Sequence, residues 1–334
     1  MMKKNFGRGL SVCMTCFGAF FGLQTAFVII MMLVLGIGNA FSSSGFMNYA
    51  WLSTIALAAA SVLMTIAMFC FHWVRKQKPA VELELNKVNW LTVLIAAVAG
   101  LAMLSVVDIG INVIPFPESW YSVFADSNDE LVGRAVPLWL TLLMIGVAGP
   151  IAEEVFFRGA LMNALRRDSN PVVAIIISAM LFGIAHAVPI QVCYATFFGI
   201  VMGVTFHLTK SIWPVIIIHM VNNIATTCGF SPASWLQNYH IVYMYIVLGF
   251  AMAILIGCTV WVALLEKNRA YRKIQPLNIK PAKDPYWTYL PAYVGYPAPY
   301  QAPPSQFYPQ QQPVYAAPAQ PQPAPQPDMA VSEV

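Results

Sequence analysis

The sequence GPIAEEVFFRG, at residues 149–159, places Glu153, Glu154 and Arg158 at the end of a long apolar run that begins near Val136. An ionised Glu or Arg at the centre of a membrane helix costs about 2.5–3.5 kcal/mol, even on the gentler insertion scales. Three such groups within six residues therefore require partners or a function. The other polar residues of the apolar segments are the candidates for those partners.

The composition indicates a membrane protein. The chain has 334 residues, of which 59% are hydrophobic and only 10% are charged, whereas a soluble domain carries roughly 25% charged residues. The mean hydropathy is +0.66. Long apolar runs separated by short charged stretches predict an all-α, polytopic protein embedded in the lipid bilayer.

Eight apolar runs are long enough to be transmembrane helices, which need about 20 residues each. They lie at about residues 16–38, 49–71, 90–114, 136–167, 171–190, 191–208, 212–229 and 241–265. Of the 18 Lys and Arg residues, only Arg134 falls in a segment that this topology places outside. The positive-inside rule then predicts cytoplasmic N- and C-termini, and we expect an integral protein of the plasma membrane. A nucleic-acid partner is excluded, because the positive charge follows the topology rather than one surface patch.

The chain divides into four regions. Residues 1–135 hold about three membrane helices with their loops, residues 136–230 a candidate catalytic core, and residues 231–275 the last membrane helix with its basic flank. Residues 276–334 contain 15 of the 24 prolines together with many Gln and Tyr residues. Such a composition cannot bury a core, so this tail is predicted to be disordered and cytoplasmic. Its spaced aromatic residues are suited to weak contacts with other proteins.

The polar residues within the predicted core lie at similar depths. At 1.5 Å per residue from the cytoplasmic ends of their helices, Glu153 and Asn223 are each about 20 Å deep. On the same scale, His186 is about 24 Å deep and His219 about 14 Å. These depths favour one buried polar pocket that opens toward the cytoplasm. Phe182, one turn before His186, is placed to form a wall of that pocket.

Helical spacing separates the roles of the two adjacent glutamates. Glu154 and Arg158 are four residues apart, so they can form an ion pair on one helix face and neutralise each other. Glu153 then points about 100° away and stays free for another task. His219 and Asn223 are also four residues apart and share one helix face.

These side chains have the chemistry needed to hydrolyse an amide bond. A carboxylate with an imidazole, here Glu153 and His186, can hold and deprotonate a water molecule. A second imidazole and a carboxamide, His219 and Asn223, are donors suited to a developing oxyanion. The alternatives are structural roles, such as a buried ion pair and hydrogen bonds between helices. The residues alone do not separate hydrolysis from ion or proton transport.

Several motifs occur in a fixed order in this region. Residues 153–158 have the pattern E-E-x-x-x-R and residues 182–186 the pattern F-x-x-x-H. Residues 198–203 and 213–214 form a glycine-bearing helix followed by Trp-Pro, and residues 219–223 have the pattern H-x-x-x-N. The ordered set resembles the CAAX protease and bacteriocin-processing (CPBP, or Abi) family of intramembrane proteases, which includes the type II CAAX prenyl endopeptidases.

The resemblance implies a membrane core of about eight helices with endopeptidase activity and a site open to the cytosolic side. By motif position, Glu153 and His186 would activate the attacking water, while His219 and Asn223 would stabilise the oxyanion. The ion pair of the first motif would hold the helix and orient the catalytic glutamate. The expected substrate is a peptide or a membrane-anchored protein. The alternative is a non-catalytic immunity or scaffold protein with the same fold.

The resemblance leaves the use of a metal open. The family is commonly labelled as metalloproteases, and Glu153, His186 and His219 are residue types that can ligate a divalent metal such as zinc. A water activated by a glutamate needs no metal, however. We therefore expect that no cofactor is required.

Overall fold

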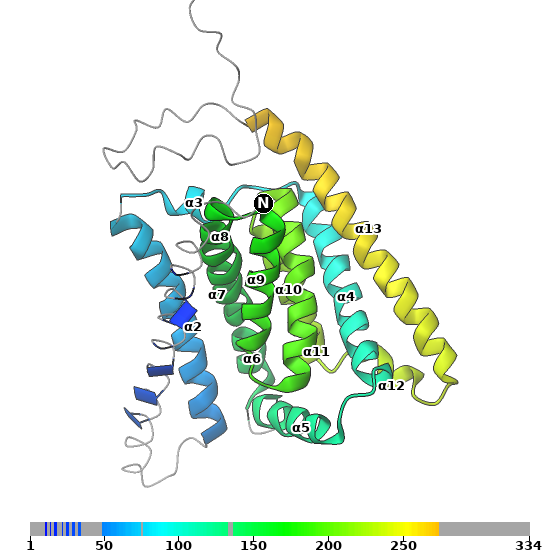
Figure 1. Ribbon diagram of the computed structural model, residues 1–334. Helices are drawn as coiled ribbons and strands as arrows, with labels where there is room; N and C mark the ends of the chain where they lie inside the picture. Colours follow the sequence, from blue (N-terminus) through cyan, green and yellow to red (C-terminus); the bar gives the residue numbers. More distant parts are fainter. Residues whose placement is uncertain are drawn as a thin grey trace, which may run out of the picture. The chain divides into compact units, whose positions relative to one another are not determined.

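A computed structural model describes residues 49–74, 76–132 and 136–273, together with isolated positions between residues 11 and 34. Every regular element in this part of the chain is a helix, which confirms the predicted all-α class (Figure 1). The first predicted membrane run, at about residues 16–38, lies largely outside the described residues, and the tail at residues 276–334 lies wholly outside them. Both stay predictions.

Within the described residues, helices occur at the other seven predicted membrane runs. Four segments are long and apolar enough to cross a membrane, judged by length and composition: α4 (Trp90–Val113), Leu138–Arg167, α10 (Pro189–Thr209) and Ile241–Glu266 of α13 (Ile241–Lys273). The remaining three runs contain α2 (Tyr49–Val74), α9 (Pro171–Ile184) and α11 (Trp213–Thr227).

The two adjacent glutamates lie in one long helical segment built from five consecutive elements. These are α6 (Leu138–Thr141), η1 (Leu142–Ala148), α7 (Gly149–Glu154), η2 (Val155–Met162) and α8 (Asn163–Asp168), of which η1 and η2 are π-helical. Pro150 accounts for the change at η1, because proline lacks a backbone N–H and its ring clashes with the carbonyl four residues earlier. Single π-helical turns within α-helices are frequent at functional sites.

The fifth predicted run is wrong at its C-terminal end. It was expected to continue to about residue 190, but α9 ends at Ile184. A short turn follows, in which Ala187 has a left-handed backbone (φ 61°). Pro189 then begins α10, and a proline disfavours helical geometry in the residue before it. His186 consequently lies on the turn rather than within the helix.

Small residues allow α9 and α10 to pack closely. A Cβ at Gly199 would lie 3.0 Å from the Cβ of Ala179, and a Cβ at Gly203 would lie 3.0 Å from Ile175 Cγ2. The spacing of Gly199 and Gly203 predicts a close helix contact, and the structure confirms it.

Three short or polar helices lie in segments between the predicted membrane runs: α3 (Pro79–Glu82), α5 (Glu118–Val132) and α12 (Pro232–Leu236). Asp108, near the C-terminal end of α4, fixes the position of α12. Its Oδ2 accepts a hydrogen bond from Ala233 N at 2.7 Å, and both carboxylate oxygens accept from Ser231 Oγ. Asp108 therefore has a structural task at the end of its helix.

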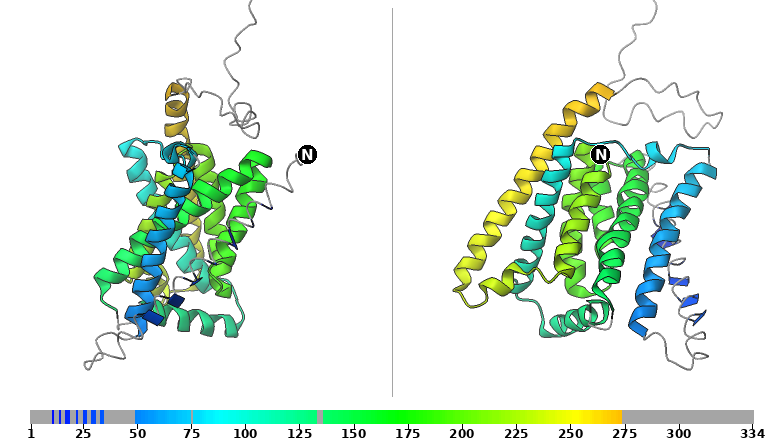
Figure 2. Two further views of the ribbon diagram at one scale, coloured as in Figure 1. Left: turned by 90° about the vertical axis from the view of Figure 1, so that its left-hand side faces the viewer. Right: turned by 180° about the vertical axis from the view of Figure 1, so that it is seen from behind.

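The long helices have two distinct ends, which all views show (Figures 1 and 2). α3 and the C-terminal end of α8 lie at one end, and α5 and α12 lie at the other. We call residues 76–89, which connect α2 to α4, the strap. The end at which they lie is the strap end, and the opposite one is the α5 end.

Candidate active site

Arg158, Glu154 and His219 form a continuous hydrogen-bonded chain across η2, α7 and α11. Oε1 of Glu154 accepts from Arg158 Nη1 at 2.9 Å and lies 2.9 Å from His219 Nδ1. All three side chains are buried. The ion pair expected from helical spacing is present, and α11 adds a third member to it. Because a carboxylate only accepts, the hydrogen lies on Nδ1 of His219.

Glu153 is the accessible member of the two adjacent carboxylates. Its side chain is 35% exposed, whereas that of Glu154 is 0% exposed. Oε2 of Glu153 lies 3.8 Å from His219 Nε2; this oxygen is itself buried and, like Oε2 of Glu154, has no hydrogen-bond partner in the described part of the chain. A general base needs a free lone pair within reach of the proton that it removes. Glu153 meets that requirement, while Glu154 is enclosed.

Phe182 supports the charged chain from within the core. Cζ of Arg158 lies over its ring, 4.5 Å from the centroid, which is a cation–π geometry. The ring also meets both histidines edge to face, with centroid distances of 4.9 Å to His186 and 5.8 Å to His219. Phe182 is itself buried. It therefore links the two imidazoles, which come from separate segments, through one rigid side chain.

His186 is held by the backbone of the preceding turn. Its Nδ1 lies 2.8 Å from the carbonyl oxygen of Phe182. A carbonyl only accepts, so Nδ1 carries the hydrogen and Nε2 remains available. Among the described residues, His186 and Glu153 form no hydrogen bond or ion pair with each other. Their joint action on a water molecule stays a prediction.

Asn223 connects α11 to η1. Its Nδ2 donates to the carbonyl oxygen of Ile145 at 3.1 Å, and its Oδ1 accepts from Asn222 Nδ2 at 3.0 Å. An amide has two N–H groups, and the contact to Ile145 uses one of them. Asn223 lies one helical turn after His219, on the same face. The second N–H is the donor that an oxyanion would need.

Two contacts of the site were not predicted from the sequence. Phe198 meets His219 edge to face, with ring centroids 5.1 Å apart. The carbonyl oxygen of Gly199 accepts from Arg158 Nη2 at 3.4 Å. Both residues lie in the glycine-bearing helix, so their motif pointed to the right element. For the contact with Arg158, the available signal was the glycine at position 199, because the carbonyl of a helical glycine is less shielded by a side chain.

The candidate metal ligands do not form a metal site. No group of three His, Cys, Asp or Glu side chains in the described part of the chain is arranged to hold a metal ion. Zinc needs three or four protein ligands at about 2.0–2.3 Å. Glu153, His186 and His219 are not assembled in that way, and the Nδ1 of His219 is used by Glu154. We therefore derive no step through a metal, and the expected lack of a cofactor stays a prediction.

The segment that carries these residues matches a known family. Residues 135–225 match the family described as type II CAAX prenyl endopeptidase Rce1-like. This segment is similar to the CAAX protease family. It runs from the residues before α6 nearly to the end of α11, and it contains both glutamates, both histidines and the asparagine of the site.

The chain is also similar to a curated protein. Over 90 residues the chain is 34% identical to "Putative membrane peptidase YdiL" of Bacillus subtilis (strain 168). The alignment covers 27% of this chain and 36% of the length of that protein. No solved structure matches the chain significantly.

Proposed function

We propose that this protein is an intramembrane endopeptidase that hydrolyses a peptide bond in a membrane-associated protein or peptide. The observation that carries the proposal is the hydrogen-bonded chain of Arg158, Glu154 and His219, which lies beside the free carboxylate oxygen of Glu153. A purely structural ion pair would need the first two residues only. The added imidazole and the unpaired carboxylate supply reactive groups.

Charge balance supports a donor role for His219. Glu153 and Glu154 contribute two negative charges, and Arg158 contributes one positive charge. Charges inside a membrane protein are tolerated when they are paired, which favours a further donor beside the second carboxylate. Nε2 of His219 lies on the side of Glu153, since Nδ1 already faces Glu154, and a hydrogen on Nε2 would be that donor.

In the proposed reaction, Glu153 takes a proton from a water molecule while the water oxygen bonds to the substrate carbonyl carbon. Nε2 of His186 helps to hold that water. The carbonyl oxygen becomes an oxyanion and accepts hydrogen bonds from His219 Nε2 and Asn223 Nδ2. The C–N bond then breaks, the proton on Glu153 passes to the leaving amine, and a carboxylic acid remains. Glu154 and Arg158 act as positioning residues, because they orient His219.

The membrane topology is part of the same proposal. We infer eight membrane-spanning helices, made of the seven in residues 49–273 and the apolar run at about residues 16–38, in the plasma membrane with both termini cytoplasmic. Two features support this topology: the length of the first run, and the position at the strap end of all described Lys and Arg side chains except the buried Arg158. These are Lys76, Lys78, Lys87, Arg166, Arg167 and Lys210.

Purified full-length protein and a peptide library test the proposed activity. We expect Glu153→Ala and His186→Ala to lose cleavage while both variants stay folded. Glu118→Ala, which removes an exposed carboxylate from α5, is the matched control and should cleave normally. Undiminished turnover in both site variants would remove the assignment.

The same variants test the non-catalytic alternative, an immunity or scaffold protein that uses its proline-rich tail for protein contacts. Full biological activity in Glu153→Ala, with loss on deleting residues beyond Pro276, would support that alternative. Addition of a chelator tests the metal question, and we expect it to leave cleavage unchanged.

A further inference from the structure

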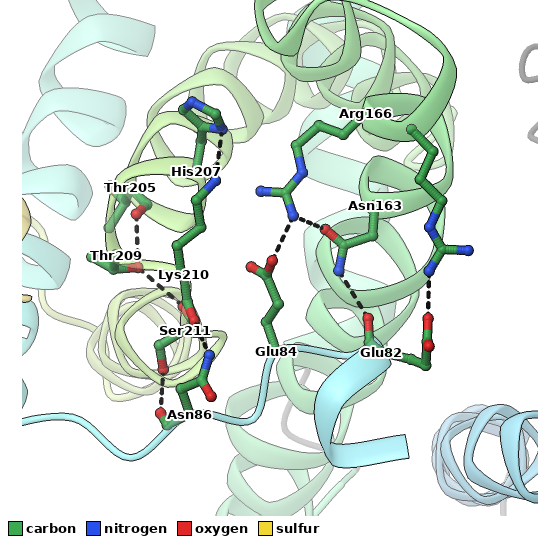
Figure 3. Close-up of polar contacts among 11 residues, drawn as sticks. Glu82, Glu84, Asn86, Asn163, Arg166, Thr205, His207, Thr209, Lys210 and Ser211 are labelled. Carbon is green, nitrogen blue, oxygen red and sulfur yellow. Dashed lines mark hydrogen bonds and ion pairs between the residues drawn. The ribbon is translucent and has the colours of Figure 1, made fainter. Parts of the chain in front are cut away.

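The strap ties together the two helical segments that carry most of the site (Figure 3). Glu84 Oε1 accepts from Arg166 Nη2 at 2.6 Å, which joins the strap to α8. Ser211 Oγ donates to the carbonyl oxygen of Asn86 at 2.6 Å. The backbone N–H of Ile212, the residue before α11, donates to the carbonyl oxygen of Glu84 at 3.1 Å. These bonds fix the N-terminal end of α11 relative to the segment that holds both glutamates.

Two glycines let α11 lie close to its neighbours. A Cβ at Gly146, in η1, would lie 2.8 Å from Ile224 Cγ1. A Cβ at Gly100, in α4, would lie 2.7 Å from the carbonyl oxygen of Ile218. Both distances are shorter than real Cβ contacts, so neither position takes a larger residue unless the helices shift. The close approach brings the backbone of η1 within reach of the asparagine side chains of α11.

Pro150 leaves one carbonyl of η1 without a helical donor. The N–H of Gly149 donates to the carbonyl oxygen of Met144, five residues earlier, which is the π-helical pattern. The α-helical donor for the carbonyl of Ile145 would be that same N–H. The π-helical donor would be position 150, where proline has no N–H. The carbonyl of Ile145 therefore needs a donor from outside its own helix, because an unpaired buried backbone group is costly.

Asn223 supplies that donor, and Asn222 holds the other end of the same carboxamide. Asn223 Nδ2 donates to the carbonyl oxygen of Ile145 at 3.1 Å, and Asn222 Nδ2 donates to Asn223 Oδ1 at 3.0 Å. A backbone carbonyl only accepts, so the nitrogen of Asn223 must be on the side of Ile145. Its Oδ1 then faces Asn222, which has to present an N–H rather than its own oxygen. The two bonds fix which way the carboxamide of Asn223 is turned.

This orientation decides which atom of Asn223 can meet an oxyanion. With the nitrogen toward Ile145, the second N–H of Nδ2 is left for the substrate. A carboxamide turned by about 180° would exchange the positions of its nitrogen and oxygen, and would place an acceptor where negative charge develops. Donors of an oxyanion site are effective because they are oriented before the reaction begins. A residue that prevents the turn would therefore act on the reaction without touching the substrate.

We propose that Asn222 is a positioning residue of the proposed endopeptidase: its Nδ2–H holds Oδ1 of Asn223, so that the carboxamide of Asn223 presents an N–H to the oxyanion. In the sequence, Asn222 occupies a variable position of the H-x-x-x-N pattern, and no motif assigns it a task. The effect on the reaction rests on the proposed function, whereas the orientation of the carboxamide does not.

Two substitutions at position 222 of the full-length protein test the effect on the reaction, with a peptide that the library experiment identifies as substrate. Asn222→Ala removes the donor but leaves the bond to Ile145, so kcat should fall about tenfold while KM changes less than about threefold. Asn222→Asp keeps the size of the side chain but places an acceptor against Asn223 Oδ1, which favours the turned carboxamide. Its kcat should fall about 100-fold or more.

Thr226→Asp is the control for the added charge. Thr226 is exposed, lies one turn after Asn222, and its Oγ1 donates to the carbonyl oxygen of Asn222 rather than to Asn223. We expect its kcat to stay within about threefold of wild type. A loss in Thr226→Asp as large as that in Asn222→Asp would overturn the proposal, because charge alone would then explain both.

The order of the two substitutions separates positioning from filling of space. A side chain that only fills space is replaced better by Asp, which has the size of Asn, than by Ala. Asn222→Asp with a kcat equal to or above that of Asn222→Ala would therefore overturn the proposal. So would a change in Asn222→Ala that falls on KM rather than on kcat.

Hydrogen exchange measured by NMR tests the orientation without turnover. The full-length protein is labelled with ¹⁵N-asparagine in detergent, and the side-chain NH₂ signals of Asn223 are identified by their loss in Asn223→Ala. In Asn222→Ala these hydrogens should exchange with water about threefold faster or more, because the carboxamide is held at one end only. An unchanged exchange rate would overturn the proposed orientation. If the peptide library shows no turnover, the endopeptidase assignment fails, while this measurement still decides the role of Asn222.

Discussion

The strap end and the α5 end are built on the same helices but differ in almost every physical property. At the strap end, Leu83 is buried, ion pairs join the strap to α8, and hydrogen bonds join it to the turn between α10 and α11. Away from the strap, the polar side chains of Glu153, His186, Asn222 and Asn223 are partly exposed. The difference indicates that one half of the protein supplies stability and the other half supplies reactivity. Stability and activity should therefore respond to mutation separately.

The largest difference between the effect on activity and the effect on stability is expected at Glu153. Glu153→Gln keeps the size of the side chain but removes the base, which should lower the cleavage rate by about 10²–10⁴-fold. The free energy of unfolding should change by less than about 1 kcal/mol, because the side chain is partly exposed and its Oε2 has no partner. Cleavage assays and thermal unfolding in detergent measure the two effects. A variant that loses stability as strongly as activity would break the comparison.

Arg158 lies where the two halves meet, and its removal should damage both. Arg158→Ala leaves the buried carboxylate of Glu154 without its cation, and breaking a buried pair in this way costs about 3–5 kcal/mol. His219 also loses its fixed orientation, so the folded fraction should cleave poorly. Arg167→Ala is the matched control: its ion pair is more exposed and should contribute about 1 kcal/mol or less. Equal losses in both variants would contradict the assignment.

Leu83 tests the strap end alone. Leu83→Ala should cost about 2–5 kcal/mol, as other buried Leu→Ala substitutions do. The specific activity of the folded protein should not change, because Leu83 packs beside Gly159 and Ile212, which are not among the site residues. Val81→Ala, at an exposed position of the same strap, should be within about 0.5 kcal/mol of wild type. A fall in specific activity of Leu83→Ala would show that the two ends are coupled.

The smallest expected effect is a gain in stability at Lys210. Burial and the nearby charge of Arg166 lower the pKa of Lys210 to about 8, while Glu84 acts in the opposite direction. Its backbone is also left-handed (φ 52°), which costs a residue with a Cβ about 1–2 kcal/mol. Lys210→Gly should therefore raise the free energy of unfolding by about 1 kcal/mol at pH 7.

The pKa of Lys210 also predicts how the stability of the protein changes with pH. The folded pKa is below the ordinary value of 10.5, so the unfolded chain binds more protons between these two pKa values. The wild type should gain stability as the pH rises from about 8 to 10.5, and Lys210→Gly should lack that gain. Histidine has an ordinary pKa of about 6.5, below this pH range, so the neighbouring His207, whose Nδ1 lies 3.3 Å from Lys210 Nζ, does not contribute to the difference. A constant difference across this range would contradict the burial of a charged Lys210.

Local spacing was sufficient to predict some of the site. The pair of Glu154 and Arg158 follows from four residues of helix, and the close contact at Gly199 follows from its small-residue spacing. The partner of Glu154 on α11 did not follow, because His219 is 65 residues away and its bond depends on how two helices are placed. The turn at His186 was also missed, since an apolar run of residues does not reveal where a helix ends within it.

The sequence by itself determined the all-α membrane class, the ion pair at positions 154 and 158, and the resemblance of residues 135–225 to a known family. These features depend on composition and on contacts within one or two turns of helix, which local sequence specifies. Only the tertiary structure decided which glutamate is enclosed and which is partly exposed, and which helix ends the strap joins. Those properties depend on residues from distant segments meeting in space. Leu83 and Glu84 show this most clearly, because nothing in their own stretch of sequence indicates that they cover one end of the helices that hold Glu153.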